Sequence, residues 1–394
     1  MAIDMASSAS DLAVPSGQSC PEAPRRGERA IEETPAAGPF LEFLRQELAP
    51  YPGRGVATLR IVIGCVVVLV LCMTLRVPEA YLAVWAVVRM AMEESRKTLL
   101  TGAVMLLALT IGLALPLALL PVAFDQPALR LCLMAAMAAL GLFLRRTFVI
   151  GALGFVIGLV GTMVMTAPDF ILKPEQAVRF TLWLWLVFAL GIGAAVATTL
   201  LIAPAAGAPD ASKSHAGHGR LFVPDALTNP EYVRYALKGT LAVMICYTLQ
   251  HAVNWPGIRT CLITCLIVAL GTEEATVQKG TLRVAGALVG AAMGFLAIML
   301  VIPSMESITS LTLLVAAGTA IAAWVTLGSP RISYAGVQIA FAFYVCVIQG
   351  FAPTWYFYTI RDRLVGILLG NAVITLVFHY LWPERAVGVA DVGK

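Results

Sequence analysis

The chain has 394 residues, of which 59% are apolar and only 13% are charged. Together with a mean hydropathy of +0.86, this composition excludes an ordinary soluble domain and indicates a membrane protein with many spans. The formal net charge of +4 comes mainly from basic residues predicted on one side of the membrane, so no nucleic-acid partner is expected.

Residues 1–55 precede the first apolar segment and form a predicted cytoplasmic tail. The start of the chain, MAIDMASSASDLAVPSGQ, lacks the basic stretch and apolar run of a cleavable signal. Disorder is expected as far as about Gly38. Residues 40–48, FLEFLRQEL, carry apolar residues at helical spacing and predict a short amphipathic helix on the membrane surface.

About twelve apolar segments follow, which predict an all-α fold, a polytopic transmembrane helical bundle. A linker rich in Ala, Gly, Pro and Ser divides them six and six. The segments lie at roughly 59–75, 80–92, 99–123, 129–143, 147–167, 180–203, 236–252, 257–272, 281–302, 308–327, 332–352 and 361–382. The predicted domains are the tail 1–55, a first six-span repeat 56–204, a cytoplasmic linker 205–232, a second six-span repeat 233–385 and a cytoplasmic tail 386–394.

The two halves share an order of features that predicts an internal duplication. Each has a basic residue entering its first span (Arg60, Lys238) and a Glu-Glu pair ending its second span. Because six is an even number, both halves cross in the same sense, and an axis along the membrane normal is expected to relate them. The second spans are short and follow Pro78 or Pro256, a pattern that points to a binding site between the halves.

The basic residues predict the orientation of the chain. If the N-terminus is cytoplasmic, twenty of the 27 Lys and Arg residues fall on the cytoplasmic side and seven on the other. The positive-inside rule therefore places both termini in the cytoplasm.

The stretch from 271 to 302 combines charges with an apolar run long enough to cross a bilayer. Arg283 lies just inside that run, where an arginine is costly in lipid. It is interpreted either as a bidentate ligand for an anionic substrate or as a side chain that snorkels to the interface. Gly286, Gly290 and Gly294 recur every four residues and predict a smooth face that another helix approaches closely.

Carboxylates at the predicted membrane boundary are candidates for proton coupling. Glu93 and Glu94 in the first half, and Glu273 and Glu274 in the second, end a short span. A titrating carboxylate there would couple proton movement to substrate release. The alternative is a hydrated anchor that pairs with nearby basic residues. Asp362 has the same two interpretations, because two arginines flank it.

Several other polar residues are candidates for substrate binding. Arg331, Arg361 and Arg363 raise the same choice as Arg283 between an anion ligand and a structural ion pair or anchor. Gln338 and Tyr344 lie within the eleventh apolar segment among aromatic residues. They suit a flat aromatic acid, or they form interhelical hydrogen bonds that need no substrate.

Several chemistries are excluded. The sequence contains no G-x-x-x-x-G-K-[ST] phosphate loop, so ATP binding of that type is not expected. G-x-S-x-G, H-E-x-x-H and C-x-x-C motifs are also absent. The chain is therefore expected to be no enzyme, with no cofactor and no metal.

Five stretches resemble the fusaric acid resistance protein family, and nearest to them are its inner-membrane permeases of multidrug and aromatic-acid efflux. The resemblance covers about residues 40–385, and its second half is the more specific. The stretches are LAPYPGRGVATLRI (48–61), PEAYLAVWAVVRMAMEESRKTLL (78–100), WPGIRTCLITCLIVALGTEEATVQKGTLRVAGALVGAAMGF (255–295), GSPRISYAGVQIAFAFYVCVIQG (328–350) and RDRLVGILLGN (361–371).

The resemblance implies export of aromatic carboxylic acids or similar amphiphiles from a Gram-negative cytoplasm, driven by the proton gradient. It also implies a multi-pass protein of the inner membrane that works with a periplasmic membrane-fusion adaptor and an outer-membrane channel. An oligomer is expected, because short periplasmic loops leave small surfaces for an adaptor.

An alternative function follows from the same resemblance. Some family members resemble plant malate channels, which implies a passive anion path lined by basic residues between two halves. The basic candidates at matching motifs are Arg60, Arg283, Arg331, Arg361 and Arg363. A third possibility is a membrane scaffold that transports nothing.

Overall fold

The computed structural model describes residues 39–90, 98–148, 151–202, 222–269, 273–305, 307–350 and 357–381. Over these ranges the chain is helical, and its one β-type contact is an isolated bridge between Phe148 and Phe222. The chain forms two compact units, residues 1–44 and 45–394. Helix α1 (Pro39–Glu47) confirms the short helix predicted before the first span, and its place on the membrane surface stays a prediction.

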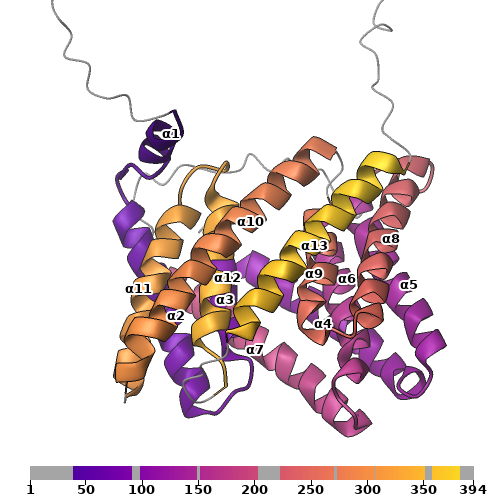
Figure 1. Cartoon of the computed structure of the whole chain (residues 1–394), viewed down its shortest axis with the longest axis horizontal. Coiled ribbons are helices and arrows are strands. Elements are labelled where there is room, and N and C mark those ends of the chain that lie inside the picture. The colour runs from indigo at the N-terminus through magenta and orange to yellow at the C-terminus, as the bar shows by residue number, and fades with distance from the viewer. Residues whose placement is uncertain are drawn as a thin grey trace, which may run out of the picture. The chain divides into compact units, whose positions relative to one another are not determined.

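A helix occupies each of the twelve apolar segments of the sequence (Figure 1). The first six are α2 (Arg54–Thr74), α3 (Ala80–Met90), α4 (Thr98–Ala123), α5 (Pro127–Thr147), α6 (Gly151–Met165), which is followed by the short 3-10 turn η2 (Ala167–Asp169), and α7 (Pro174–Leu201). The second six are α8 (Pro230–Ala252), α9 (Thr260–Val268) with the preceding turn η3 (Pro256–Arg259), α10 (Glu273–Leu296) with its continuations η4 (Ala297–Val301) and η5 (Ile302–Ser304), α11 (Ile308–Thr326), α12 (Ser333–Val347) and α13 (Tyr358–Tyr380).

Seven of these stretches are long and apolar enough to cross a membrane, within the described part of the chain. They are α2, α4, α5, α7, α10 with its continuation to Ser304, α11 and α13. Apolar helices α3, α6, α9 and α12 are shorter. The 15 residues of α12 cover about 22 Å of a hydrocarbon core of about 30 Å. The predicted polytopic helical bundle is confirmed, and α3, α9 and α12 end within the depth of such a core.

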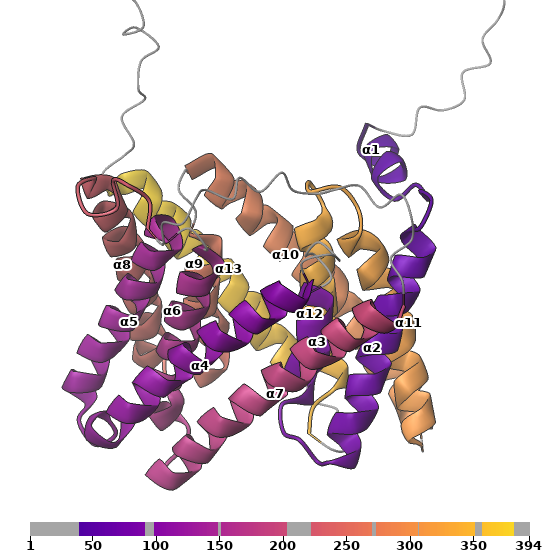
Figure 2. The same ribbon diagram turned by 180° about the vertical axis from the view of Figure 1, so that it is seen from behind.

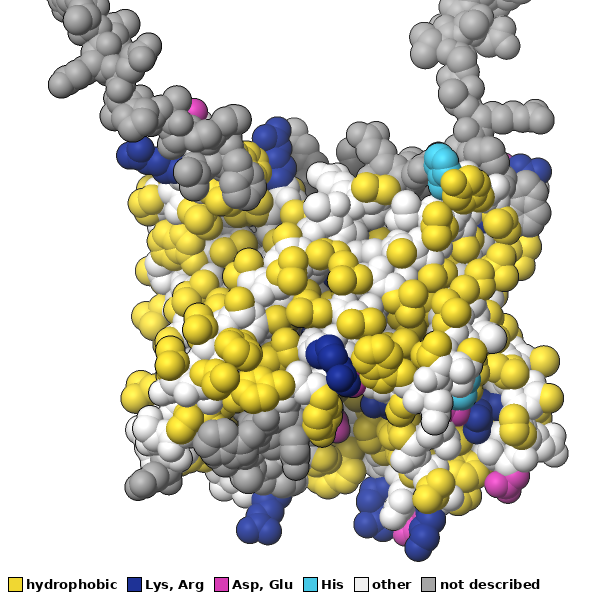
Figure 3. Space-filling model, viewed as in Figure 1, with side chains coloured by type: hydrophobic (Ala, Val, Ile, Leu, Met, Phe, Trp, Pro, Cys, Tyr) yellow, Lys and Arg dark blue, Asp and Glu magenta, His cyan; other side chains and the backbone are white. Residues whose placement is uncertain are grey.

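Helix α2 shows how the long helices divide their surface. Leu59, Ile63, Val67 and Leu71 recur every four residues and are 58%, 37%, 52% and 39% exposed. The opposite face, which includes Cys65, is buried. Large exposed apolar side chains are unfavourable in water and favourable in lipid. The face over α10 and α13 is likewise mostly hydrophobic (Figure 3).

The helix contacts follow the same order in both sets of six. In the first set α2 packs on α3 and α7, and α4 packs on α6 and α7; in the second, α8 packs on α9 and α13, and α10 packs on α12 and α13. Contacts between the sets also come in pairs, α2 with α11 and α5 with α8, α3 with α12 and α6 with α9. Helices α10 and α13 face the viewer in Figure 1, and their counterparts α4 and α7 face the viewer when the molecule is turned by 180° (Figure 2).

The glycine face predicted on α10 is confirmed. A Cβ added at Gly286 would meet the backbone of Ala335, one at Gly290 the backbone of Ile339, and one at Gly294 the side chain of Cys346. All three partners lie on α12. The absence of these Cβ atoms lets the α10 and α12 backbones approach closely, which favours helix association in lipid.

Candidate functional site

Arg283 of α10 is fully buried, with 0% of its surface exposed. Its Nε donates to Thr264 Oγ1 of α9 at 3.2 Å. One terminal nitrogen, NH1, donates to Gln338 Oε1 at 2.9 Å and to the Tyr334 hydroxyl at 3.3 Å, both on α12. The second terminal nitrogen, NH2, is buried without a hydrogen-bond partner. Arg283 therefore does not snorkel to an interface, because its guanidinium is held between α9 and α12.

Arg363 of α13 is a second buried guanidinium, with 6% of its surface exposed. It lies over the ring of Phe341 of α12, with Cζ 3.9 Å from the ring centroid. Its Nε and NH2 atoms are buried without a hydrogen-bond partner. Stacking on an aromatic face stabilises the charge but leaves the N–H groups at the edge of the guanidinium unused.

One face of α12 brings the two arginines together. Tyr334, Gln338 and Phe341 are separated by four and three residues, the spacing of neighbours on one helix face. Arg283 donates hydrogen bonds to Tyr334 and Gln338, and Arg363 stacks on Phe341. The two arginines are close enough for their like charges to repel each other. Lys279, one turn before Arg283 on α10, lies 5.1 Å from the Tyr334 ring. We call Lys279, Arg283 and Arg363 the cation row.

The short helix α3 of the first set supplies aromatic surface beside this row. The Tyr81 and Trp85 rings lie 6.2 and 5.2 Å from the Phe341 ring. The indole Nε1 of Trp85 is buried without a hydrogen-bond partner. The opposite short helix α9 supplies Thr264. The two short spans that follow prolines therefore both border the cation row, and the binding site predicted from their pattern stays a prediction.

The charges of this region are unbalanced. Among the described residues, no carboxylate lies within salt-bridge distance of Arg283 or Arg363. An ionised group buried without a counter-charge is strongly destabilising. The unpartnered N–H groups are donors only, and the arrangement they suit is a bound anion with two or more acceptor oxygens, such as a carboxylate.

The first set of helices has no comparable charge at the matching contacts among its described residues. Where α4, α6 and α7 meet, the buried side chains are the apolar cluster Leu109, Leu113, Val160, Val164 and Leu184. Among the described residues, the buried arginines Arg283 and Arg363 lie on α10 and α13, and the aromatic and amide side chains that contact them lie on α12. The candidate site is therefore built by the second set, with α3 as its contribution from the first.

The structure separates the other predicted ligands from Arg283. Arg361 is exposed, pairs with Asp362 at 2.8 Å and lies over the Trp255 ring. Arg60 borders a small pocket lined by α2, α3, α4 and α7. Arg331 is exposed in the turn before α12. Of the predicted substrate ligands, the structure brings together Arg283, Gln338 and Arg363.

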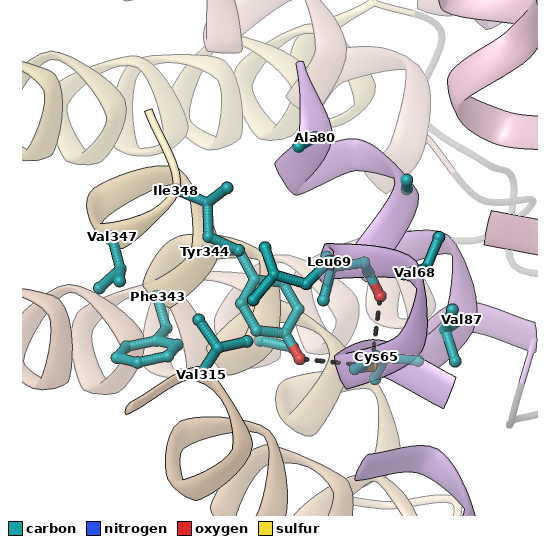
Figure 4. Packing of buried hydrophobic residues seen from close by; sticks show 14 of the residues in the cluster. Cys65, Val68, Leu69, Ala80, Val87, Val315, Phe343, Tyr344, Val347 and Ile348 are labelled. Atoms are coloured by element: carbon teal, nitrogen blue, oxygen red, sulfur yellow. Dashed lines mark hydrogen bonds between the residues drawn. The ribbon is translucent and has the colours of Figure 1, made fainter. Parts of the chain in front are cut away.

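Tyr344 points away from the cation row, into the apolar core. It is fully buried, and its hydroxyl lies 2.7 Å from that of Thr319 and donates to Cys65 at 3.8 Å. Figure 4 shows its ring among Leu69, Val315 and Ile348. Of the two interpretations of Tyr344, substrate binding and interhelical hydrogen bonding, its contacts fit the second.

The predicted proton carriers are only partly described. Glu93 and Glu94 lie outside the described residues. Helix α10 begins at Glu273, but the side chains of Glu273 and Glu274 also lie outside the described set. Asp362 has 8% of its surface exposed and forms the ion pair with Arg361.

Four residues of the site, Tyr81, Trp85, Thr264 and Lys279, were not predicted as ligands from the sequence. Tyr81 and Trp85 lie on the short span after Pro78, and that pattern alone marked their helix. Thr264 belongs to an apolar run without a signal of its own, because only the fold shows that it faces Arg283.

Comparison with known proteins identifies related sequences. Residues 241–377, which contain Arg283, Gln338 and Arg363, match the family described as fusaric acid resistance protein-like. The chain is 40% identical over 164 residues to the multidrug resistance protein MdtO of Shigella flexneri, and 40% identical over 161 residues to MdtO of Escherichia coli K12. Each match covers 41% of this chain and 24% of MdtO, about a quarter of that relative's length. No solved structure matches the chain. The resemblance to this family is thereby confirmed for residues 241–377.

Proposed function

We propose that this chain, whose residues 241–377 match the fusaric acid resistance protein-like family, is an efflux permease for organic anions, aromatic carboxylic acids among them. The observation that carries the proposal is the pair Arg283 and Arg363, two buried guanidiniums on one face of α12 with unpartnered N–H groups. The relatives named multidrug resistance proteins support export as the direction of transport.

In this proposal the substrate carboxylate supplies the missing counter-charge. The NH2 group of Arg283 and the Nε and NH2 groups of Arg363 donate to its oxygens. Tyr81, Trp85 and Phe341 provide flat surface for an aromatic ring. Because α3 and α13 come from different sets of helices, the substrate would contact both sets at once. A movement of one set relative to the other would then change access to the site.

Reconstituted flux tests the proposal directly. The full chain is placed in liposomes, and radiolabelled hydroxybenzoate is followed for wild type, Arg283→Gln and Arg363→Gln. Loss of one charged hydrogen-bonding group corresponds to about tenfold weaker apparent affinity. Arg331→Gln is the matched control, because Arg331 is exposed. Equal affinity in all four proteins contradicts the proposal.

Thermal unfolding separates a binding role from a structural role. If Arg363 is a substrate ligand, Arg363→Met removes an uncompensated buried charge, and the ligand-free protein becomes as stable as wild type or more stable. If Arg363 is structural, the same substitution lowers the unfolding temperature. Flux and unfolding measured on one preparation therefore distinguish the two roles.

A passive organic-anion channel is the second candidate function. It is favoured by the cation row itself, because Lys279 and Arg283 of α10 and Arg363 of α13 all lie against α12. No carboxylate is bound to either arginine among the described residues. A channel conducts hydroxybenzoate along a voltage in planar bilayers at equal pH on both sides. A proton-coupled exporter instead accumulates hydroxybenzoate when only a pH gradient is imposed.

The proposed setting is the bacterial inner membrane with both termini in the cytoplasm. Proton coupling through Glu93, Glu94, Glu273, Glu274 or Asp362, assembly with a periplasmic adaptor and an outer-membrane channel, and a homo-oligomer belong to the same proposal. So does the origin of the two sets of helices as repeats, which their matching order of contacts supports. Cysteine cross-linking of the cytoplasmic tail in sealed vesicles tests the orientation.

A further inference from the structure

A second charged cluster lies where α5 and α8, one from each set of helices, meet the turn η2. Asp169 of η2 has 8% of its side chain exposed, and its Oδ1 accepts from Arg130 of α5 at 2.7 Å and from the Tyr247 hydroxyl of α8 at 3.2 Å. Its other oxygen, Oδ2, is buried without a hydrogen-bond partner. One half of this carboxylate is therefore satisfied and the other half is not.

His251, in the last turn of α8, faces the unpartnered oxygen. Its Nε2 lies 3.6 Å from Asp169 Oδ2. Its Nδ1 lies 2.9 Å from the backbone oxygen of Tyr247. A carbonyl oxygen only accepts, so Nδ1 carries the hydrogen, and in the neutral ring Nε2 presents a lone pair to the carboxylate. When His251 is neutral, His251 Nε2 and Asp169 Oδ2 therefore face each other as two acceptors with no hydrogen between them.

A proton on Nε2 removes this mismatch. It converts the contact into an N–H donor facing a carboxylate oxygen, a charge-assisted hydrogen bond with a preferred length of about 2.7–2.9 Å. Two further features favour the protonated ring. His251 lies at the C-terminal end of α8, where the helix dipole favours a cation, and its ring centroid is 4.2 Å from that of Tyr247. Its side chain is 44% exposed, so the ring is not sealed inside the protein.

We infer that His251 and Asp169 form a proton-binding site that tightens the contact between the two sets of helices. The other charged groups around it are Arg130 of α5, and Arg259 of η3, which stacks 4.1 Å from the ring of Phe170, the residue after Asp169. On α13, Arg361 and Asp362 neutralise one another beside η3. Proton binding draws the end of α8 toward η2, and with it the second set toward the first.

The link from this site to transport rests on the proposed function. Histidine changes charge between about pH 5 and 8, so the site responds to the acidity of the compartment that it faces. In the predicted orientation that compartment is the periplasm. An exporter with this site would sense or use periplasmic protons at a place distant in sequence from the glutamate pairs.

Nitrogen NMR of labelled histidine tests proton binding without any transport. The full chain is prepared in nanodiscs, and His251→Gln identifies the His251 signal among the four histidines. We expect the Nδ1–H tautomer at high pH, and a change in the pH response of this signal when Asp169→Asn removes the carboxylate. An Nε2–H tautomer, or a pH response that Asp169→Asn leaves unchanged, overturns the inference.

A second measurement does not depend on the folding of Asp169→Asn. The unfolding temperature of wild type is compared with that of His251→Gln at about pH 8 and about pH 5.5. Wild type should gain stability relative to the variant on acidification, because the new hydrogen bond exists only in the folded, protonated protein. A constant difference between wild type and His251→Gln overturns the inference.

Flux keeps the two proposals distinguishable. If hydroxybenzoate is transported, His251→Gln should weaken the dependence of its efflux on external pH, and a dependence equal to that of wild type overturns the link to transport. If wild type carries no hydroxybenzoate at all, the proposed function fails, while the NMR titration still decides whether His251 and Asp169 bind the proton.

Discussion

The Arg283 guanidinium donates a 2.9 Å hydrogen bond to Oε1 of Gln338, and this bond joins α10 to α12 inside the bundle. Both residues are buried, at 0% and 2% exposure. A neutral amide orients the arginine without cancelling its charge. The bond therefore leaves the cation available to an anion, which a carboxylate at the same position would not.

The substitution Gln338→Glu turns this relationship into a prediction. A glutamate would neutralise Arg283, so the unfolding temperature should rise while hydroxybenzoate affinity falls about tenfold. Thermal unfolding and equilibrium binding on one preparation measure both effects. Gln349→Glu is the control on the same segment, because the Gln349 amide donates to the backbone oxygen of Val345 and not to Arg283. Unchanged affinity in Gln338→Glu would place the anion elsewhere.

Close contact between α10 and α12 gives a second prediction. Gly290→Ala would place a Cβ against the backbone of Ile339, and because backbone cannot yield as a side chain does, α10 must move off α12. We expect a loss of at least about 1 kcal/mol in the free energy of unfolding. At Gly193 of α7 nothing lies within 4 Å of an added Cβ, so Gly193→Ala should cost nothing. Unfolding in detergent compares the two variants.

The sequence predicted the features that depend on a single helix. Gly286, Gly290 and Gly294 mark one face whatever that face touches, because their spacing alone places them together. Arg283 within a long apolar run was recognisable as costly for a similar reason. The short spans after Pro78 and Pro256 marked α3 and α9, and both border the cation row.

Features that depend on two or more helices could not be predicted in this way. The stacking of Arg363 on Phe341 joins residues of α13 and α12 through a helix crossing that no local pattern specifies. Tyr344 points into the core instead, because it follows Gln338 by six residues, a spacing that turns a helix by about 600° and so places the two side chains about 120° apart. Asp169 and His251 come from different sets of helices, so their sequence spacing carries no information about the contact.

The segment before α2 gives a third prediction. Arg54 has 1% of its surface exposed, donates to the backbone oxygens of Glu47, Ala49 and Trp324, and stacks on the Trp324 ring. The Trp324 indole in turn donates to the backbone oxygen of Leu48 at 3.0 Å. Through Arg54 and Trp324, these hydrogen bonds hold the backbone of residues 47–49 against α11.

Arg54→Ala should release this segment, because alanine replaces none of the three donors. We expect faster proteolysis at residues 47–53 and a loss of at least about 2 kcal/mol in the free energy of unfolding. Arg179→Ala is the control, since Arg179 and its partner Glu175 are both largely exposed and such pairs contribute little. Identical cleavage of Arg54→Ala and wild type would contradict the fastening.

Tyr344 provides the prediction that separates the core from the site. Its hydroxyl bonds to Thr319 at 2.7 Å between α12 and α11, so Tyr344→Phe should lower the free energy of unfolding by about 0.6 kcal/mol, the average for such bonds in membranes. Hydroxybenzoate affinity should stay at the wild-type value. Thr319→Val removes the same bond from the other partner and should give a similar loss, whereas the double variant should lose no more than either single variant. A drop in affinity for Tyr344→Phe with no change in stability would instead return Tyr344 to the substrate path, and the anion would then have to reach the α2–α11 side of α12.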